Sequence, residues 1–320
     1  MGEIIEQIEN FGLSKKNQPK TQFSKVGIIG CGTVGQDIAI MVSLCGMDVV
    51  FVEKTAEKIE AADESMSLTL DGMIDRWGMT NSEKKAILSR IKGSLDCQIF
   101  KGCDIVVEAL KSKTGENGTV IRKEIFKNIE KYIDPSAIIA TNAPTIMITE
   151  LSSELEHPER CVCFHFLSPA AEARVVEVAR GMHTTDEIYK NVIKFAKLIN
   201  KEVVPVVESP GNISTRLIVP LINEACEVLM EGVGEMEDID KVMRIGFSMQ
   251  LGPFEMADKM GLDKLHTWME NLYEEFGDKK YKASPLIKKL VRANQLGRRT
   301  GRGFYIYDES GRKIINNILL

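Results

Sequence analysis

The chain has 320 residues, of which 44% are hydrophobic and 27% are charged, and its formal net charge is −5. This composition is typical of a globular protein with room for about two domains. The acidic balance argues against nucleic acid as a partner. Because no apolar run approaches the length of a bilayer span, we expect no membrane partner either.

The first 22 residues are predicted to be an appendage and a linker outside the domains. Acidic residues interrupt their apolar positions, which argues against a signal peptide. The seven cysteines form no CxxC pair, and scattered cysteines in odd number indicate reduced thiols and a cytoplasmic location. Cys161 and Cys163 would share one face of a strand, but no further cluster of ligands accompanies them. We therefore expect no metal site.

Residues 25–53 have the order of strand, glycine turn, helix, strand and acid that is typical of a dinucleotide-binding unit. An apolar run at 26–29 leads into the turn GCGTVG, and a second apolar run at 49–52 stops on Glu53. Gly30 allows the sharp turn, Gly32 lets the backbone approach a pyrophosphate, and Gly35 lets the helix pack closely on the sheet. The start of the helix offers free N–H groups and a positive dipole to the anion.

Glu53 lies where a carboxylate can accept hydrogen bonds from both hydroxyls of the adenosine ribose. A 2′-phosphate in that place would meet like charge, so the sequence favours NAD over NADP as the cofactor. The residues predicted to bind NAD in this unit are Gly30, Gly32, Thr33, Val34, Gly35 and Glu53.

Strands and helices alternate in the chain up to about residue 209. Helices are predicted at 55–77, from 80 onward, at 120–133 and at 186–199, and strands at 104–109, 138–141, 161–166, 174–178 and 203–207. This alternation predicts an α/β Rossmann-type domain over residues 23–209 with a doubly wound, mostly parallel sheet. Helical spacing then dominates at 217–230, 236–243, 253–259, 264–276 and 285–294, before a strand-like run at 303–307. We therefore predict an all-α C-terminal domain over residues 210–320.

Six separated motifs resemble those of the short-chain L-3-hydroxyacyl-CoA dehydrogenases, a family that includes bacterial 3-hydroxybutyryl-CoA dehydrogenases. They are VGIIGCGTVG (26–35), VVEA (106–109), HFLSPAAEARVVEV (165–178), ESPGNISTRLIVPLINEA (208–225), LGPFEMADKMGLD (251–263) and RRTGRGFYIYD (298–308). The resemblance implies that an L-3-hydroxyacyl-CoA is oxidised to the 3-oxoacyl-CoA by hydride transfer to NAD, or the reverse. It also implies a homodimer formed by the C-terminal domain, around residues 217–222 and 251–262.

The same resemblance assigns roles to four side chains. His165 is implied to be the catalytic acid and base, and Glu177 its partner. A neutral imidazole can accept the hydroxyl proton as C3 loses hydride, while the carboxylate holds the ring tautomer and stabilises the imidazolium. Asn142 matches the asparagine of the family's SNTSS segment and is implied to be a positioning residue. Glu108 is implied to lie near the far end of the cofactor.

Three polar positions of the family's active site differ in this chain. Pro144 replaces the serine expected to bond the reacting oxygen, Thr215 replaces the asparagine beside it, and Ser168 replaces the asparagine of HFFNP. Proline has neither a hydroxyl nor an N–H group, and losing one donor at a developing oxyanion typically costs about 2.7–4 kcal/mol. Either Thr145 or Thr215 supplies the missing donor to a short or unusual acyl substrate, or the chain has lost much of the activity.

Other departures from the family pattern leave alternatives open. Glu172 and Arg174 indicate either a polar acyl tail or a solvent-facing ion pair on a strand edge. Lys111, Lys113 and Arg122 either attract the phosphates of CoA or are simply solvated. The competing functions are a non-catalytic or weakly active NAD(H)-binding protein and a dehydrogenase of a 3-hydroxy acid without CoA.

Overall fold

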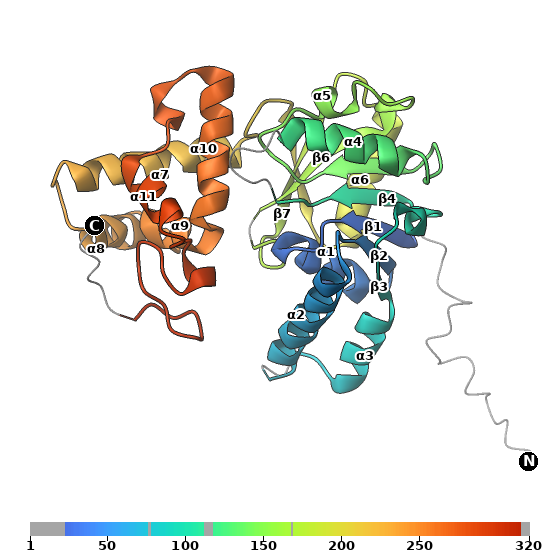
Figure 1. The fold of residues 1–320 in the computed structure, drawn as a ribbon, viewed down its shortest axis with the longest axis horizontal. Helices are drawn as coiled ribbons and strands as arrows, with labels where there is room; N and C mark the ends of the chain where they lie inside the picture. The colour runs from blue at the N-terminus through green and yellow to red at the C-terminus, as the bar shows by residue number, and fades with distance from the viewer. Residues whose placement is uncertain (1–22, 76–77, 112–117, 168, 315–320) are drawn as a thin grey trace, which may run out of the picture.

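A mostly parallel sheet of eight strands forms the centre of the N-terminal domain (Figure 1). The strands are β1 (Lys25–Ile29), β2 (Asp48–Val52), β3 (Ile91–Ser94), β4 (Ile105–Glu108), β5 (Ile138–Thr141), β6 (Cys161–Phe166), β7 (Val175–Arg180) and β8 (Glu202–Val207). Their order is β3-β2-β1-β4-β5-β6-β7-β8, so the chain starts inside the sheet and winds outward in both directions. The computed structural model describes residues 23–75, 78–111, 118–167 and 169–314, and the predicted appendage at 1–22 lies outside these ranges.

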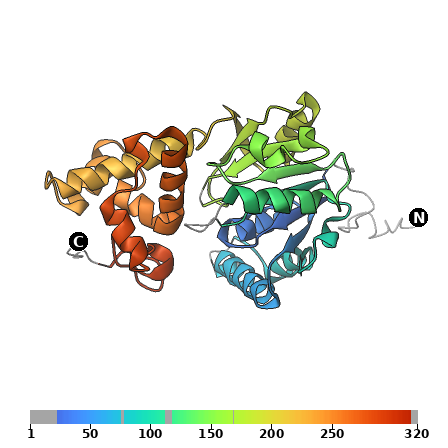
Figure 2. The ribbon, with the colours of Figure 1, turned by 45° about the horizontal axis from the view of Figure 1, so that its top comes forward.

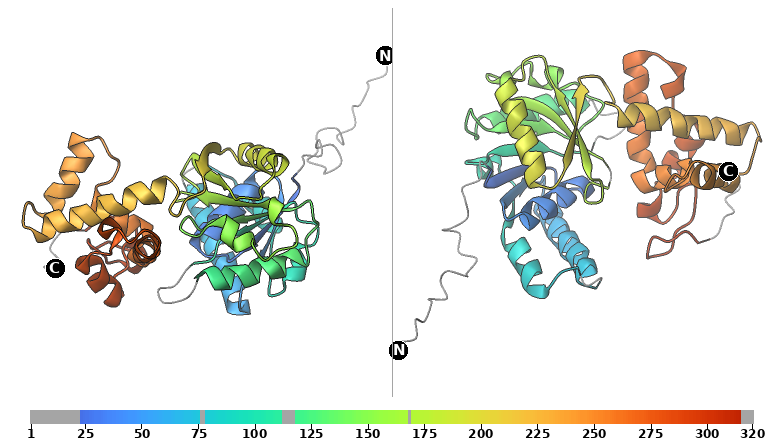
Figure 3. Two further views of the ribbon diagram at one scale, coloured as in Figure 1. Left: turned by 90° about the horizontal axis from the view of Figure 1, so that it is seen from above. Right: turned by 180° about the vertical axis from the view of Figure 1, so that it is seen from behind.

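Helices cover both faces of this sheet, as Figure 3 shows from above. They are α1 (Thr33–Leu44), α2 (Ala56–Asp75), α3 (Asn81–Ser89), α4 (Gly118–Glu130), α5 (Ile148–Ser152) and α6 (Asp186–Leu198), with the short η2 (Cys97–Phe100) and η3 (Pro158–Arg160). One hydrophobic cluster joins α1, α2, α3 and α6 to the sheet, and a second joins η2, α4 and α5 to it. Ile105 and Val107 of β4 belong to the first cluster and Val106 to the second, as the alternation of side chains along a strand requires. The predicted doubly wound α/β class is confirmed.

An antiparallel pairing between β6 and β7 sets two polar side chains opposite each other. His165 of β6 is the register partner of Glu177 of β7, and both side chains are buried. Directly opposite residues on neighbouring antiparallel strands point to the same face of the sheet. The register of this pair of strands therefore brings the imidazole and the carboxylate together.

The C-terminal domain is helical and surrounds a third hydrophobic cluster. Its elements are α7 (Ser214–Met230), α8 (Met236–Lys241), the π-helical turn η4 (Val242–Gly246), α9 (Pro253–Met260), α10 (Leu262–Phe276), η5 (Lys279–Tyr281), α11 (Pro285–Arg292) and η6 (Arg298–Thr300). Figure 2 shows this domain beside the sheet domain, with the chain crossing between them after β8. Throughout the described ranges, every helix is too short or too polar to cross a membrane.

The expectation of a strand at 303–307 is wrong. Within the described residues this run makes only isolated bridges. The N–H groups of Phe304 and Tyr305 instead donate to the carboxylate of Asp258, at 2.9 and 2.8 Å. Because this buried carboxylate satisfies the backbone donors, the aromatic side chains pack into the helical core without a partner strand.

The variant Gly35→Ala tests the close packing of α1 on the end of β1. A Cβ at this position would lie 2.2 Å from the carbonyl oxygen of Gly30, a backbone atom that cannot move without disturbing the turn. We expect the free energy of unfolding to fall by about 1–3 kcal/mol, the usual cost of overpacking. Urea denaturation followed by circular dichroism measures this change.

Gly72→Ala, in the last turn of α2, is the matched control because nothing lies within 4 Å of the added Cβ. Alanine exceeds glycine in helix propensity by about 1 kcal/mol, so this variant should be at least as stable as the parent. Equal losses of stability in the two variants would contradict the packing argument.

Candidate active site

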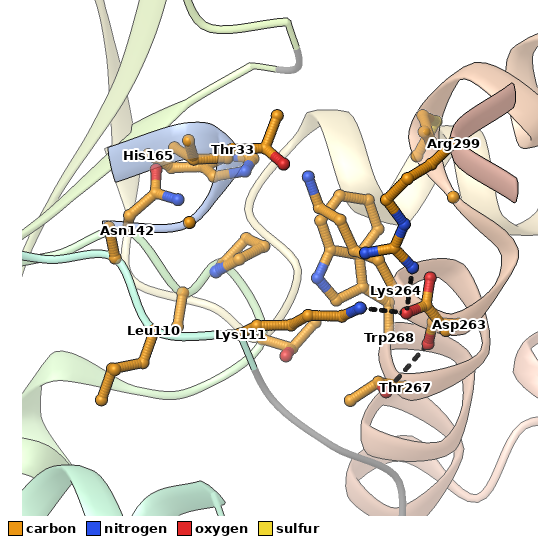
Figure 4. Close-up of a pocket in the computed structure, with 18 of the residues that line it drawn as sticks. Thr33, Leu110, Lys111, Asn142, His165, Asp263, Lys264, Thr267, Trp268 and Arg299 are labelled. Atoms are coloured by element: carbon orange, nitrogen blue, oxygen red, sulfur yellow. Dashed lines mark hydrogen bonds and ion pairs between the residues drawn. The ribbon is translucent and has the colours of Figure 1, made fainter. Parts of the chain in front are cut away.

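A cleft of about 350 Å³ lies between the two domains (Figure 4). The sheet domain lines it with the glycine turn before α1 and with the segments that follow β4 and β5. The helical domain lines it with the end of α9, the start of α10 and part of η6. Open parallel sheets bind their ligands at the carboxyl ends of the strands, and this cleft lies at that edge.

The glycine turn between β1 and α1 has the geometry of an anion site. Gly30 has φ +87°, a conformation that glycine adopts without strain. Gly32 is the N-cap residue of α1, and because it has no side chain it leaves the N–H groups at the start of the helix uncapped. An added Cβ on Gly32 would meet nothing within 4 Å, and Thr33 and Val34 line the cleft with it. The start of α1 is therefore open to a ligand, and the residues present fit the pyrophosphate of a dinucleotide.

Glu53 at the end of β2 is tied to the same turn. One carboxylate oxygen accepts the N–H of Cys31 at 2.7 Å, and the other accepts the N–H of Lys54 at 3.2 Å. The side chain is half-buried, so the carboxylate is held beside the turn without being sealed inside the protein. Its contact with ribose hydroxyls stays a prediction.

The imidazole of His165 and the carboxylate of Glu177 form a buried hydrogen-bonded pair. Nδ1 of His165 lies 2.9 Å from Oε2 of Glu177, and His165 lines the cleft. A carboxylate can only accept, so Nδ1 carries the proton and Nε2 keeps its lone pair. Burial lowers the pKa of His165 and outweighs the bond from Glu177, which raises it, while the charge of Lys264 lowers it further. The ring is therefore neutral at pH 7 and able to accept a proton.

Glu177 also binds the first residues of the helical domain. Its Oε1 accepts the N–H groups of Ile213 and Ser214 at 3.1 and 2.7 Å, and its Oε2 accepts the Ser214 hydroxyl at 2.8 Å. Burial alone raises the pKa of Glu177, but the bonds from His165 and Ser214 outweigh it and leave that pKa below its ordinary value. Glu177 is therefore ionised, and one carboxylate holds the imidazole and caps the start of α7.

Asn142 follows β5 and points its amide into the cleft beside His165 (Figure 4). Its Oδ1 accepts the N–H of Phe166 at 2.8 Å, and this bond fixes the orientation of the amide. The NH2 group of Asn142 is then the part available to a ligand. This arrangement makes Asn142 a candidate donor to an oxygen that reacts next to His165.

Pro144 and Thr145 lie on the same wall of the cleft. The carbonyl oxygen of Pro144 accepts the N–H of Gly211 at 2.7 Å, so this segment also contacts the linker to the helical domain. The Thr145 hydroxyl accepts a bond from Nδ2 of Asn271 on α10 at 2.9 Å. Because that bond uses an oxygen lone pair, the hydroxyl hydrogen of Thr145 remains available to a substrate.

Thr215 is buried in the first turn of α7, outside the set of residues that line the cleft. Its hydroxyl oxygen has no hydrogen-bond partner among the described residues. Of the two threonines expected to replace the missing donor, Thr145 is the one that the fold exposes to a ligand. Ser168, the third altered position, lies outside the described residues.

Glu108 is fully buried behind the segment that follows β4. Its carboxylate accepts the N–H of Leu110 at 2.8 Å and the Thr141 hydroxyl at 2.6 Å, and it pairs with Nε of Arg122 at 3.0 Å. Arg122 in turn donates to the carbonyl oxygen of Leu110 at 2.8 Å. Arg122 is thus engaged in a buried pair and is not simply solvated. The pair supports the wall of the cleft, and a contact of Glu108 with the cofactor stays a prediction.

Ion pairs cross the boundary between the domains on both sides of the cleft. Lys111, after β4, pairs with Asp263 at the start of α10. Glu172 pairs with Lys259 of α9 at 2.9 Å. Of the two alternatives left open for Glu172 and Arg174, the ion pair between them is not the one that Glu172 forms, because the helical domain brings a lysine to Glu172. These ion pairs link the two walls of the cleft across the domain boundary.

Trp268 and Lys264 of α10 were not among the site residues predicted from the sequence. Trp268 meets the His165 ring edge to face, with ring centroids 6.2 Å apart and an interplanar angle of 80°. Lys264 lies one helical turn earlier, with its ammonium 4.7 Å from the centroid of the Trp268 ring. The signal in the sequence was their spacing of four residues, which places both on one face of a helix directly after the motif that ends at residue 263.

The titration of His165 tests the electrostatics of the pair. We expect a neutral imidazole at pH 7, protonated on Nδ1, in a titration followed by imidazole ¹⁵N chemical shifts. Glu177→Gln removes the charge that raises the pKa of His165, so that pKa should fall further. Glu159→Gln is the control, because Glu159 pairs with His157 on the surface. A His165 that is protonated at pH 7, or that responds equally to both variants, would contradict this account.

Comparisons with known proteins agree with this geometry. Residues 25–209 match the profile of the 3-hydroxyacyl-CoA dehydrogenase NAD binding domain, and residues 211–307 match that of the 3-hydroxyacyl-CoA dehydrogenase C-terminal domain. The chain is 35% identical over 285 residues to a 3-hydroxybutyryl-CoA dehydrogenase of Clostridioides difficile, covering 89% of this chain and 100% of that protein. It is 34% identical to a probable 3-hydroxybutyryl-CoA dehydrogenase of Bacillus subtilis, covering 90% and 99% of the two chains.

Solved structures give the same result for the fold. The crystal structure of (S)-3-hydroxybutyryl-CoA dehydrogenase from Ralstonia eutropha is similar with a TM-score of 0.79 and 35% identity, covering 90% of this chain and 100% of that one. A diketoreductase acting on dicarbonyl compounds is similar with a TM-score of 0.75 and 27% identity, covering 90% and 100%. With both domains matched in order, the chain belongs to the 3-hydroxyacyl-CoA dehydrogenase family.

Proposed function

We propose that this chain interconverts an L-3-hydroxyacyl-CoA of short or unusual acyl chain and the corresponding 3-oxoacyl-CoA, with NAD as the cofactor. The observation that carries the proposal is the buried pair of His165 and Glu177, whose free Nε2 faces the cleft that the glycine turn also lines. NAD, held by the turn and by Glu53, supplies the acceptor for the hydride from C3. The 3-hydroxybutyryl-CoA dehydrogenases named above support the choice of a CoA thioester.

The proposed acid and base is His165. Its neutral Nε2 accepts the proton of the 3-hydroxyl group as C3 loses hydride, and in the reverse direction the same nitrogen returns it. Glu177 holds the proton on Nδ1 and stabilises the imidazolium that forms. Because burial lowers the pKa of His165, the base remains unprotonated at neutral pH without a further group to activate it.

Asn142 and Thr145 are the proposed donors to the reacting oxygen. The amide of Asn142 is oriented by Phe166, and the Thr145 hydroxyl keeps a free hydrogen in the cleft. Together they take the place of the serine that Pro144 replaces. Thr215, the alternative donor, lies outside the set of residues that line the cleft, so a role for its hydroxyl would require a shift of α7.

A dehydrogenase of a 3-hydroxy acid without CoA is the second candidate function. The similarity to a diketoreductase favours it, because the substrates of that protein are dicarbonyl compounds. A non-catalytic NAD(H)-binding protein is less well supported. A protein that only binds NAD(H) has no need of a buried base coupled to a carboxylate.

We also propose a cytoplasmic homodimer. The seven cysteines are free thiols, which fits a reducing compartment. Of the two segments expected at the dimer contact, 251–262 lies mostly within the helical core, through Phe254, Ala257 and Leu262. The other expected segment, 217–222, exposes Leu217 (67% exposed), and further exposed apolar side chains of the helical domain lie around η4, at Ile245 (68% exposed) and Phe247 (71% exposed). We place the contact there, since such patches mark interfaces.

The proposed role of His165 is tested by His165→Ala. We expect kcat for the reduction of acetoacetyl-CoA with NADH to fall by about 10²–10⁴-fold, the usual contribution of a general acid or base. NADH binding, measured by fluorescence, should persist because His165 does not belong to the glycine turn. Full activity in this variant would contradict the mechanism.

Thr145→Val and Thr215→Val identify the donor within the same assay. Removal of one oxyanion donor costs about 10²–10³-fold in kcat, so Thr145→Val should be the more damaging of the two. Pro144→Ser should raise kcat if the lost hydroxyl limits the rate. A larger loss in Thr215→Val would move the donor to α7.

The proposed dimer contact is tested by Phe247→Asp. A carboxylate in an apolar interface is desolvated without a partner, so the variant should elute as a monomer in size-exclusion chromatography with light scattering. Met182→Asp is the control, because Met182 is also apolar and 79% exposed but belongs to the sheet domain. A dimer that survives Phe247→Asp would exclude this surface.

A further inference from the structure

Five cationic side chains line the cleft between the domains: Lys111, Arg122, Lys259, Lys264 and Arg299. Four of them have a carboxylate partner. Lys111 and Arg299 both pair with Asp263, Arg122 pairs with Glu108, and Lys259 pairs with Glu172. No carboxylate of the described residues pairs with Lys264. Figure 4 shows the bonds of Lys111 and Arg299 to Asp263 and none from Lys264.

Lys264 also lies close to the reacting position. Its ammonium lies over the face of Trp268, and the same indole meets His165. The charge of Lys264 contributes, after burial, to the lowered pKa of His165. The ammonium and the imidazole therefore belong to one part of the cleft, where both lie against the same indole.

The nearby charge of Asp263 raises the pKa of Lys264, but neither this charge nor the contact with Trp268 gives the ammonium an ion-pair partner. A cation–π contact is available to a fully solvated lysine at little cost, whereas a desolvated ammonium without an anion is unfavourable. Burial in the cleft lowers the pKa of Lys264 to about 8. An anionic ligand group would give Lys264 the kind of partner that the other four cations already have.

We propose that Lys264 binds a carboxylate of the substrate, so that the preferred substrate is a 3-hydroxyacyl or 3-oxoacyl compound with a free carboxylate. The favoured form is a CoA half-thioester of a dicarboxylic acid, with the carboxylate at the far end of the acyl chain. This inference rests on the proposed function and names its substrate class. One ammonium balances one negative charge, which fits a carboxylate better than a phosphate dianion.

Two thioesters of equal chain length test the proposal: 3-oxoadipyl-CoA, which ends in a carboxylate, and 3-oxohexanoyl-CoA, which ends in a methyl group. We expect the parent protein to favour 3-oxoadipyl-CoA in kcat/KM by about tenfold or more, the equivalent of one modest charge pair. Lys264→Met should abolish that preference by raising KM for 3-oxoadipyl-CoA alone. Lys264→Arg should retain most of it.

Lys259→Met is the matched control, because it removes a lysine that lines the same cleft but already pairs with Glu172. The ratio of kcat/KM for the two thioesters should stay the same in this variant. A ratio near one in the parent protein would overturn the proposal. A Lys264→Met variant that loses activity equally on both thioesters, or whose KM rises for NADH, would also overturn it by assigning Lys264 to the reacting oxygen or the cofactor.

The preference should also depend on pH. The charged and titratable groups that line the cleft with Lys264 are Asp263 on its own helix, Asp258 and Lys259 on α9, His165 on β6, Lys111 after β4, Arg122 on α4 and Arg299 in η6. Burial raises the pKa of Asp258 to about 6, so Asp258 is ionised between pH 7 and 9. Bonds from Lys111 and Arg299 outweigh burial and lower the pKa of Asp263, so it stays ionised, while His165 stays neutral. Lys264 loses its charge as the pH rises through about 8. KM for 3-oxoadipyl-CoA should therefore rise between pH 7 and 9, and KM for 3-oxohexanoyl-CoA should not.

Two further measurements distinguish a failure of this inference from a failure of the proposed function. If neither thioester is reduced, the proposed function fails, and the dissociation constants of adipyl-CoA and hexanoyl-CoA still test Lys264 without turnover. Tighter binding of adipyl-CoA that Lys264→Met removes would support the inference, and equal binding would overturn it. Faster reduction of free 3-oxohexanoate than of either thioester, lost in Lys264→Met, would assign the bound carboxylate to a free acid.

Discussion

The carboxylate of Glu177 is the interaction on which the rest of the site depends. It accepts a hydrogen bond from the imidazole of His165 on the neighbouring strand and from the first N–H groups of α7 in the other domain. The same negative charge therefore orients the imidazole, which we propose to be the base, and sets where the helical domain begins relative to the sheet. An ionised carboxylate at the start of a helix is favoured by the unpaired N–H groups and the dipole there. The chemistry and the assembly of the two domains share one residue.

The cleft owes its shape to charges that are paired across its walls. Asp263 forms ion pairs with Lys111 of the sheet domain and with Arg299 of its own domain. The buried ion pair of Glu108 and Arg122 supports the segment after β4 that carries Lys111. Because each of these charges already has a partner of opposite sign, it attracts charged ligands less strongly. Lys264 stands apart from this pattern among the described residues, and the proposed substrate carboxylate follows from that difference.

The altered positions of the site fall into two groups once the fold is known. Pro144 lies in the cleft, where the hydroxyl lost at this position leaves that of the neighbouring Thr145 on the same wall. Thr215 lies in the first turn of α7, where its hydroxyl is buried and without a partner in the part of the chain that the structure describes. A substitution in the cleft acts on the substrate directly, whereas one beneath α7 acts through the helix. The altered positions thus need not have one common cause.

The sequence by itself determined the local structure and the dinucleotide-binding unit. Hydrophobic periodicity, the glycines of the turn and the acid at Glu53 are patterns among residues that lie close together along the chain. The turn at 30–35, the doubly wound sheet and the helical second domain followed from such patterns, and the motif at 165–178 led to His165 and Glu177. The short edge strand β3, with the sequence IKGS, and the five-residue α5 carry too few apolar residues to be seen in that way. Only the tertiary structure decided which charges meet. The partner of Glu172 is Lys259, the carboxylate beneath 303–307 is Asp258, and the cation beside His165 is Lys264. These contacts join elements that are far apart along the chain. The contact of Asp258 forms when the helical domain folds, and those of Lys259 and Lys264 form only when the two domains enclose the cleft.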